Sequence, residues 1–165
     1  MLIGLFADTH DNLPMVEKAV KKLNDAKVTL VLHAGDYVSP FVIPKFEALD
    51  ARLIGVFGNN DGDREFLKKR FSECKNCEIH GRFAEVNAEG WKIALLHGDE
   101  LELLEALINS GGFDAVVHGH SHVVGISRKG RSLAVNPGEV CGYLSGKCTM
   151  ALLDTVKREA QIVEL

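Results

Sequence analysis

Short apolar runs alternate with helix-like segments along the first half of the chain. Residues 2–7, 28–32 and 53–57 are almost continuously apolar, which is typical of strands buried on both faces. Each run is followed by apolar side chains at helical spacing. These side chains are Val16, Ala19, Val20 and Leu23, then Phe41, Val42, Phe46 and Leu49, then Phe66, Leu67 and Phe71. The alternation predicts right-handed crossovers and a parallel sheet.

The second half of the chain is richer in hairpin signals. Residues 82–86 alternate between apolar and polar, residues 89–90 mark a turn, and residues 91–96 return as a strand. A helix over residues 103–108, a short strand at 115–117, a hairpin turning at 129–130 and strands near 148–154 and 159–164 follow. We therefore predict an α/β fold with two packed mixed β-sheets flanked by helices, an αββα sandwich forming a single domain over residues 1–165.

Composition and charge narrow the class of protein. The chain has 165 residues, of which 46% are hydrophobic and 25% are charged, as in an ordinary globular domain. Its N-terminus has no basic leader, and no apolar run approaches the ~20 residues of a spanning helix, so we expect a cytoplasmic protein without a membrane partner. The net charge of −4 argues against stable nucleic-acid binding, which needs a basic surface.

The four cysteines indicate free thiols, because an apparently intracellular chain rarely carries a disulfide framework. Cys74 and Cys77 have the spacing of half a zinc knuckle. Cys141 and Cys148 are separated by six residues and do not complete it. We expect structural thiols rather than zinc or redox chemistry.

Polar residues gather where the predicted strands end. Five strands are followed by short loops that hold Asp, Asn or His, and these residues are Asp8, His10, Asp36, Asn59, His97, His120 and His122. In α/β sheets, ligands bind outside the carboxyl ends of the strands, where such loops meet. On extended backbone, residues two apart point the same way at about 6–7 Å, so both rings of the His-x-His pair would reach one polar site.

The donor types indicate a metal centre. Carboxylate, carboxamide and imidazole groups without a thiolate suit divalent ions such as Mn²⁺, Fe²⁺, Ni²⁺, Zn²⁺ or Mg²⁺. One carboxylate can bridge two ions, and a close pair of ions can activate a water molecule and clamp an in-line displacement at phosphorus. Taken singly, the residues have ordinary alternatives: a turn for Asp36, left-handed backbone for Asn59 or Asn60, and a helix cap for Asp61. Asn136 is expected to be a turn residue.

Five short motifs, in order, resemble the calcineurin-like metallophosphoesterases. They are Asp8-x-His10, Gly35-Asp36, Gly58-Asn59-Asn60-Asp61, His97-Gly98-Asp99 and Gly119-His120-Ser121-His122. The compact length and the later Asn136-Pro137-Gly138 are similar to the small YfcE-like phosphodiesterase branch.

The resemblance implies a two-metal site, with Mn²⁺ or Ni²⁺ foremost. One ion would be held by Asp8, His10, Asp36 and His122. Asp36 would bridge to the second ion, completed by Asn59, His97 and His120. The resemblance also implies a phosphodiesterase in which a metal-bridging hydroxide attacks the phosphorus of small or activated diesters.

One position departs from the family pattern. Many members carry histidine after the metal-binding asparagine, whereas this chain carries Asn60, which cannot act as a general acid. General acid catalysis is commonly worth about 10²–10⁴-fold, so esters with poor leaving groups should react slowly. The catalytic set is expected to be Asp36, Asn59, Asn60 and His97.

Two other functions stay open. A phosphomonoesterase or nucleotide phosphatase would use the same residues on a small phosphate ester. A metal-binding protein-interaction scaffold, like the retromer subunit of the same fold, would keep the architecture without catalysis, although the seven filled ligand positions favour an enzyme. The chain has little room for a capping domain, so specificity would depend on short loops or on a homo-oligomer partner.

Overall fold

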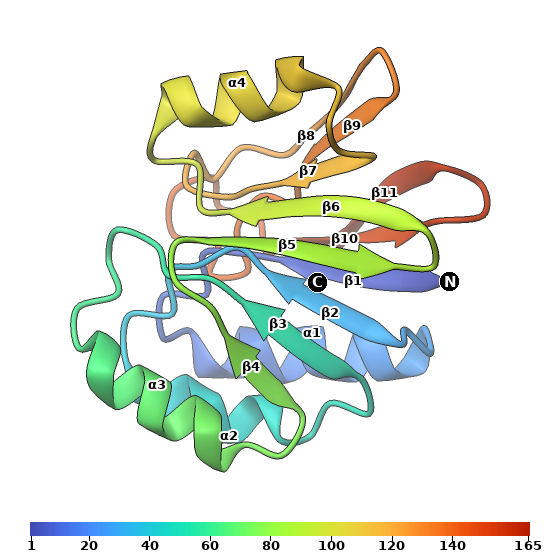
Figure 1. Ribbon diagram of the computed structural model, residues 1–165. Coiled ribbons are helices and arrows are strands. Elements are labelled where there is room, and N and C mark those ends of the chain that lie inside the picture. Colours follow the sequence, from blue (N-terminus) through green and yellow to red (C-terminus); the bar gives the residue numbers. More distant parts are fainter.

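Two β-sheets pack face to face and are covered by helices on their outer faces (Figure 1). The computed structural model describes residues 1–165. The strands are β1 (Leu2–Phe6), β2 (Leu30–His33), β3 (Arg52–Gly55), β4 (Cys77–Ile79), β5 (Phe83–Ala88), β6 (Trp91–Leu96), β7 (Ala115–Val117), β8 (Gly125–Lys129), β9 (Ser132–Asn136), β10 (Thr149–Asp154) and β11 (Glu159–Glu164). The helices are α1 (Leu13–Asp25), α2 (Ile43–Phe46), α3 (Arg64–Glu73) and α4 (Leu101–Ser110).

The first sheet has the order β11-β10-β1-β2-β3-β4. The four adjacent strands β1 to β4 are parallel to one another. β10 joins β1 in the antiparallel sense and β11 follows β10, which makes the sheet mixed. The predicted parallel unit is confirmed. The sequence did not predict β4, because this strand has only three residues and a single fully buried side chain, Cys77.

The second sheet has the order β5-β6-β7-β9-β8. The predicted hairpins β5–β6 and β8–β9 are both antiparallel, and β7 lies between β6 and β9 in the parallel sense. Helix α4 covers this sheet, whereas α1, α2 and α3 cover the first one (Figure 1). The predicted α/β sandwich of two mixed sheets flanked by helices is confirmed.

Alternation of side chains along the strands divides the core into layers. In β1, Ile3 and Leu5 point into a cluster of 20 buried residues between the two sheets, together with Leu95 from β6. Phe6 points the other way, into a cluster of 21 buried residues beneath the helices of the first sheet. Burial of each Leu or Phe contributes about 1.5–3 kcal/mol to the stability of the fold. Packing in these two layers therefore holds the strands, and the loops at their ends, in place.

Two helix predictions are wrong in detail. The helix expected over residues 41–49 is a 3₁₀ turn (Pro40–Val42) followed by the single turn of α2. Phe41 is consequently 73% exposed rather than inward, because the change from 3₁₀ to α geometry shifts the helical phase. In α3, Leu67 and Phe71 are buried as predicted, but Phe66 lies at the rim and is 43% exposed.

The expectation of four free thiols is also wrong. Cys74 and Cys77 form a disulfide, and only Cys141 and Cys148 are free. Helix α3 ends at Glu73, and the turn that follows brings the two Cα atoms to 5.3 Å, which is within the span of a disulfide. None of the helices is long and apolar enough to cross a membrane.

Candidate metal centre

Loops from both sheets meet at one edge of the molecule. Strands β1, β2 and β3 are parallel to one another, as are β6 and β7, and all five end on the left side of Figure 1. The loops after these strands carry the seven predicted ligand residues. The structure therefore brings together residues that are up to 114 positions apart, from Asp8 to His122.

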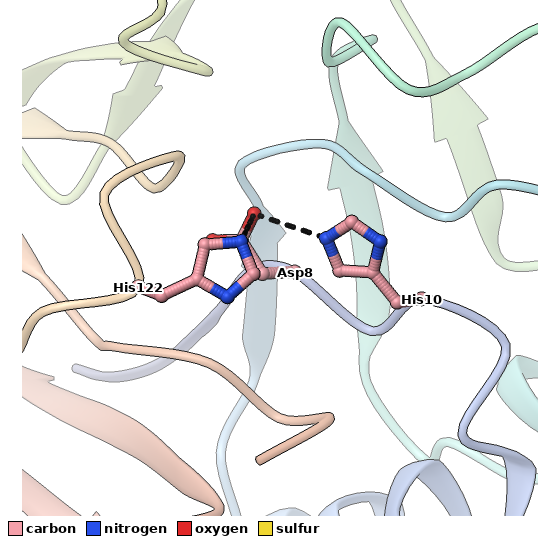
Figure 2. A group of neighbouring side chains, drawn as sticks. All are labelled: Asp8, His10 and His122. Atoms are coloured by element: carbon pink, nitrogen blue, oxygen red, sulfur yellow. Dashed lines mark ion pairs between the residues drawn. The ribbon is translucent and has the colours of Figure 1, made fainter. Parts of the chain in front are cut away.

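The first group consists of Asp8, His10 and His122. Figure 2 shows both imidazoles beside the Asp8 carboxylate, each joined to it by a dashed line. The Asp8 Oδ1 atom lies 3.7 Å from His10 Nε2 and 3.5 Å from His122 Nε2. Asp8 is fully buried, and neither its Oδ1 atom nor His10 Nε2 has a hydrogen-bond partner. Buried polar atoms are normally paired, so converging unpaired donors fit a bound cation.

The second group consists of Asp36, Asn59 and His97. His97 is held by a hydrogen bond between its Nδ1 atom and the Ala34 carbonyl at 2.8 Å. Its Nε2 atom lies 2.8 Å from Asn59 Oδ1 and 3.4 Å from Asp36 Oδ2. Three potential ligand atoms therefore face one another, and this nitrogen and oxygen set again suits a borderline divalent ion.

Asp36 lies between the two groups. Its Oδ2 atom is 3.4 Å from His10 Nε2 on one side and 3.4 Å from His97 Nε2 on the other. Asn60 donates from its backbone N–H to Asp36 Oδ1 at 2.9 Å and from Nδ2 to Oδ2 at 2.7 Å. Burial raises the pKa of Asp36, but the hydrogen bonds from His97 and Asn60 outweigh it and hold the pKa well below its usual range. The carboxylate is thus kept ionised, as a bridging ligand must be.

His120 completes the set on the open side. Its ring is exposed and lies 5.1 Å from the ring of His97, edge to face. Its backbone N–H donates to Asp8 Oδ2 at 3.1 Å. This close approach depends on Gly119, where an added Cβ would lie 2.7 Å from Asp8 Oδ2.

The backbone at the site is unusual. Ten non-glycine residues have positive φ, and five of them are Asp8, His10, Asp36, His120 and His122. Such conformations are sparsely populated for residues with a Cβ atom and are retained mostly at functional sites. Half of the non-glycine residues with positive φ are therefore candidate ligands.

Sequence reasoning missed Glu139, which is fully buried beneath the site. Its Oε2 atom accepts a hydrogen bond from His122 Nδ1 at 2.7 Å, which turns His122 Nε2 toward Asp8. The backbone N–H groups of Leu144 and Ser145 also donate to this carboxylate. Burial raises the pKa of Glu139, but the hydrogen bonds outweigh it and lower the pKa to about 2. The only signal in the sequence was its place directly after the turn at 136–138.

Two further residues have roles other than those expected. Asp61 does not cap α3, because Asp63 does so by accepting from the Phe66 N–H at 3.0 Å. Asp61 is buried and instead accepts from the backbone N–H groups of the two loops beside it. The donors are Gly58, Asp36, Tyr37 and Val38. Asn136 is more than a turn residue, since its Nδ2 donates to the Gly119 carbonyl at 2.9 Å and steadies the His-x-His loop.

Comparison with known proteins defines the family. The model of the calcineurin-like phosphoesterase superfamily domain matches residues 1–158, so the chain belongs to this family. The chain is 42% identical to phosphodiesterase MJ0936 of Methanocaldococcus jannaschii over 165 residues, which cover 100% of this chain and 99% of the relative.

Solved structures agree with this assignment. The structure of an archaeal phosphodiesterase superposes with a TM-score of 0.95 at 42% identity, covering 100% of both chains. YfcE, a phosphoesterase from E. coli, superposes with a TM-score of 0.71 at 19% identity, covering 94% of this chain and 89% of YfcE. The second likeness establishes the fold alone.

Proposed function

We propose that this protein is a two-metal phosphodiesterase that hydrolyses small or activated phosphate diesters. Family membership and full-length similarity to a phosphodiesterase support this function. The observation that carries it is the position of Asp36, whose Oδ2 atom lies 3.4 Å from both His10 Nε2 and His97 Nε2. One ionised carboxylate between two groups of nitrogen and oxygen donors is the arrangement that a close pair of cations requires.

We assign Asp8, His10 and His122 to one ion and Asn59, His97 and His120 to the other, with Asp36 shared between them. Divalent ions bound there would lower the pKa of a water molecule and polarise the phosphoryl oxygens of a diester. Mn²⁺ or Ni²⁺ are the ions we favour, and Zn²⁺, Fe²⁺ and Mg²⁺ are compatible with the same donors.

The side chains on the open face position the substrate. Asn59, Asn60 and His120 are exposed there, whereas Asp8, Asp36 and His97 are buried behind them. The Asn60 amide is a hydrogen-bond donor that can hold a phosphoryl oxygen, but it cannot supply a proton to the leaving group. This composition favours esters whose leaving group is already stable as an anion.

Hydrolysis by chelator-stripped protein tests the proposal. Each divalent ion is added back, and turnover of bis(p-nitrophenyl) phosphate is compared with that of p-nitrophenyl phosphate. We expect an ion to restore diester hydrolysis, and we expect Asp36→Ala and Asn59→Ala to abolish it. Asp25→Ala on α1 and Asn87→Ala on β5 are matched controls, because both side chains are exposed and lie in other elements.

Other outcomes identify the alternatives. Faster hydrolysis of the monoester would make the protein a phosphomonoesterase. Protein that binds two ions and hydrolyses neither ester would be a metal-binding scaffold.

A further inference from the structure

A cavity of about 330 Å³ adjoins the candidate metal centre and has His122 in its wall. The cavity continues from His122 along Val123 and Val124 and reaches Ile162 in β11. A larger hollow of about 570 Å³ between α1 and α2 has no residue in common with the site. Of these two cavities, only the smaller one is therefore placed to receive a group attached to a phosphate at the metal centre.

The floor of this cavity has a fixed shape. Thr149 is buried there, and its Oγ1 atom donates to the Pro137 carbonyl at 2.7 Å. Gly138 has φ +78°, and a Cβ atom at this position would lie 2.2 Å from Thr149 Oγ1 and 2.7 Å from Val124 Cγ1. The turn at 137–138 thus packs tightly against Thr149 and Val124, two residues that line the cavity. This packing holds both residues in place and keeps the cavity open.

One wall of the cavity is tied to the metal centre through Glu139. This wall includes Ser145, whose backbone N–H donates to Glu139 Oε1. The same carboxylate accepts from His122 Nδ1 at 2.7 Å. A single buried side chain therefore anchors both a candidate metal ligand and the cavity wall, so that the two are held in one geometry.

The lining combines apolar surface with a few polar groups, as small-molecule sites do. Val123 and Val124 are 65% and 46% exposed, so both apolar side chains are accessible to a ligand in the cavity. Lys147 lies at the same cavity and supplies an ammonium donor, whereas the Ser145 hydroxyl already donates to the Lys147 carbonyl at 3.1 Å and can only accept. Pockets of about 300 Å³ and more are large enough for a ring-sized group, whereas a methyl group would leave most of this one unfilled.

We propose that this cavity is the subsite for the organic group of the phosphate ester, and that it takes an apolar group of ring size, such as an aryl ring or a nucleobase. The proposal rests on the proposed phosphodiesterase function. The ester would place its phosphate at the metal centre and its ring against Val124 and Ile162, with the ring edge toward Ser145 and Lys147.

Diesters with a common leaving group test the subsite. Methyl, phenyl and thymidine 5′ esters of p-nitrophenyl phosphate all release p-nitrophenolate, so differences in kcat/KM report on the retained group. We expect the phenyl or thymidine ester to exceed the methyl ester by about 10-fold or more, since a ring buries several times the apolar surface of a methyl group. A higher kcat/KM for the phenyl ester would indicate a simple aryl substrate, and a higher kcat/KM for the thymidine ester would indicate a nucleotide.

Val124→Ser should lower the ratio of ring ester to methyl ester several-fold. The matched control is Val156→Ser in the β10–β11 turn, where Val156 is 81% exposed and lines no part of the cavity. A wild-type ratio near one would overturn the proposal. So would a Val124→Ser ratio equal to that of the control.

A second measurement separates failure of the subsite from failure of the catalytic function. Phenylphosphonate and methylphosphonate are titrated into protein loaded with a diamagnetic ion, Zn²⁺ or Mg²⁺, while the methyl resonances of Val124 and Ile162 are followed by NMR. Methyl shifts that phenylphosphonate causes and methylphosphonate does not cause support the subsite. If phenylphosphonate causes no such shifts, the subsite proposal is overturned. If no diester is hydrolysed with any ion, the proposed function fails, and the methyl shifts alone decide whether the cavity binds a ring.

Discussion

We expect Asn60 to determine which leaving groups the site can expel. Its backbone N–H donates to Asp36 Oδ1 and its side-chain amide donates to Asp36 Oδ2, but the side chain carries no titratable proton. We expect the wild-type protein to hydrolyse bis(p-nitrophenyl) phosphate far faster than a dialkyl phosphate. Asn60→His should raise dialkyl turnover, by up to about 10²–10⁴-fold, and change aryl turnover much less.

The two substrate classes are measured side by side, and Asn60→Ala is the control because it supplies no acid. Equal wild-type rates on both classes would contradict the prediction. So would an alanine variant that gains dialkyl activity as histidine does.

Glu139 orients a candidate ligand without facing the open site. In Glu139→Gln, the side-chain oxygen can still accept from His122 Nδ1, but the amide NH₂ would then face the N–H donors of Leu144 and Ser145. This clash would displace the amide and with it the acceptor that orients His122. Disturbing the partner of a metal-bound histidine commonly weakens metal affinity by about 10–100-fold, and we expect a loss of this size. Calorimetric titration of the stripped protein with Mn²⁺ measures it directly.

Glu105→Gln is the matched control for this substitution, because Glu105 is exposed on α4. Equal affinities in the two variants would show that Glu139 only supports its loop. Near-ultraviolet circular dichroism verifies that Glu139→Gln is folded.

At the scale of the elements, Asp61 joins the loops that follow β2 and β3. It accepts four backbone hydrogen bonds, at 2.7–3.1 Å, from Gly58 and from residues 36–38. Burial raises the pKa of Asp61, and its hydrogen bonds only partly oppose that effect. Through these hydrogen bonds, the Asp61 carboxylate sets the position of Asp36 relative to Asn59. The sequence did not reveal this role, because Asp61 lies near the start of a helix and was expected to cap it.

Substitution by asparagine separates this role from capping. Asp61→Asn should destabilise the protein by about 1–3 kcal/mol, because an amide NH₂ would be buried against N–H donors. Asp63→Asn should change stability by only a few tenths of a kcal/mol, since asparagine caps helices about as well as aspartate. Urea unfolding midpoints measure both variants. Equal losses would mean that Asp61 acts as a cap after all.

The strands and the candidate ligands were predictable because their signals are local. An apolar run such as residues 2–7 predicts a buried strand. The polar residue that follows the run lies at the carboxyl end of that strand, independently of the rest of the chain. The signals failed where geometry depends on distant packing. Phe41 faces outward because a 3₁₀ turn shifts the helical phase, and β4 exists only because Cys77, Glu78 and Ile79 pair with β3. Glu139 reaches His122 only because residues 139–145 form a loop that closes over its carboxylate.

At the scale of the whole molecule, another buried carboxylate ties the two sheets together, at the edge where β6 begins. Asp114, just before β7, accepts from the Lys92 N–H at 3.0 Å and from Arg131 Nη2 at 2.9 Å. It also accepts from Arg158 Nη2 at 3.2 Å, and Arg158 lies in the β10–β11 turn of the first sheet. The Arg158 guanidinium stacks 4.4 Å above the ring of Trp91 in the second sheet. Asp114 and Arg158 therefore add a charged link between the two sheets to the apolar contacts of the shared core.

This link makes stability depend on pH in a predictable direction. Burial raises the pKa of Asp114, but the hydrogen bonds from Lys92, Arg158 and Arg131 outweigh it and lower the pKa below its ordinary value. A carboxylate with a lower pKa in the folded state stabilises the protein at every pH above its unfolded pKa of about 3.9. That stabilisation is lost as the pH falls through the folded-state value.

Asp114→Asn should therefore destabilise the protein at pH 7 by about 1–2 kcal/mol, a value reduced because both arginines are about half exposed and screened by solvent. The gap between the variant and the wild type should persist at pH 5 and narrow at pH 3 and below. Urea unfolding of both proteins, stripped of metal, measures the gap at each pH. Taking the difference cancels the titration of the metal-centre residues, which both proteins share. Asp25→Asn, exposed on α1, is the control and should show no comparable difference in stability from the wild type. If the difference for Asp114→Asn stays constant down to pH 2, the charge of Asp114 contributes nothing to holding the sheets together.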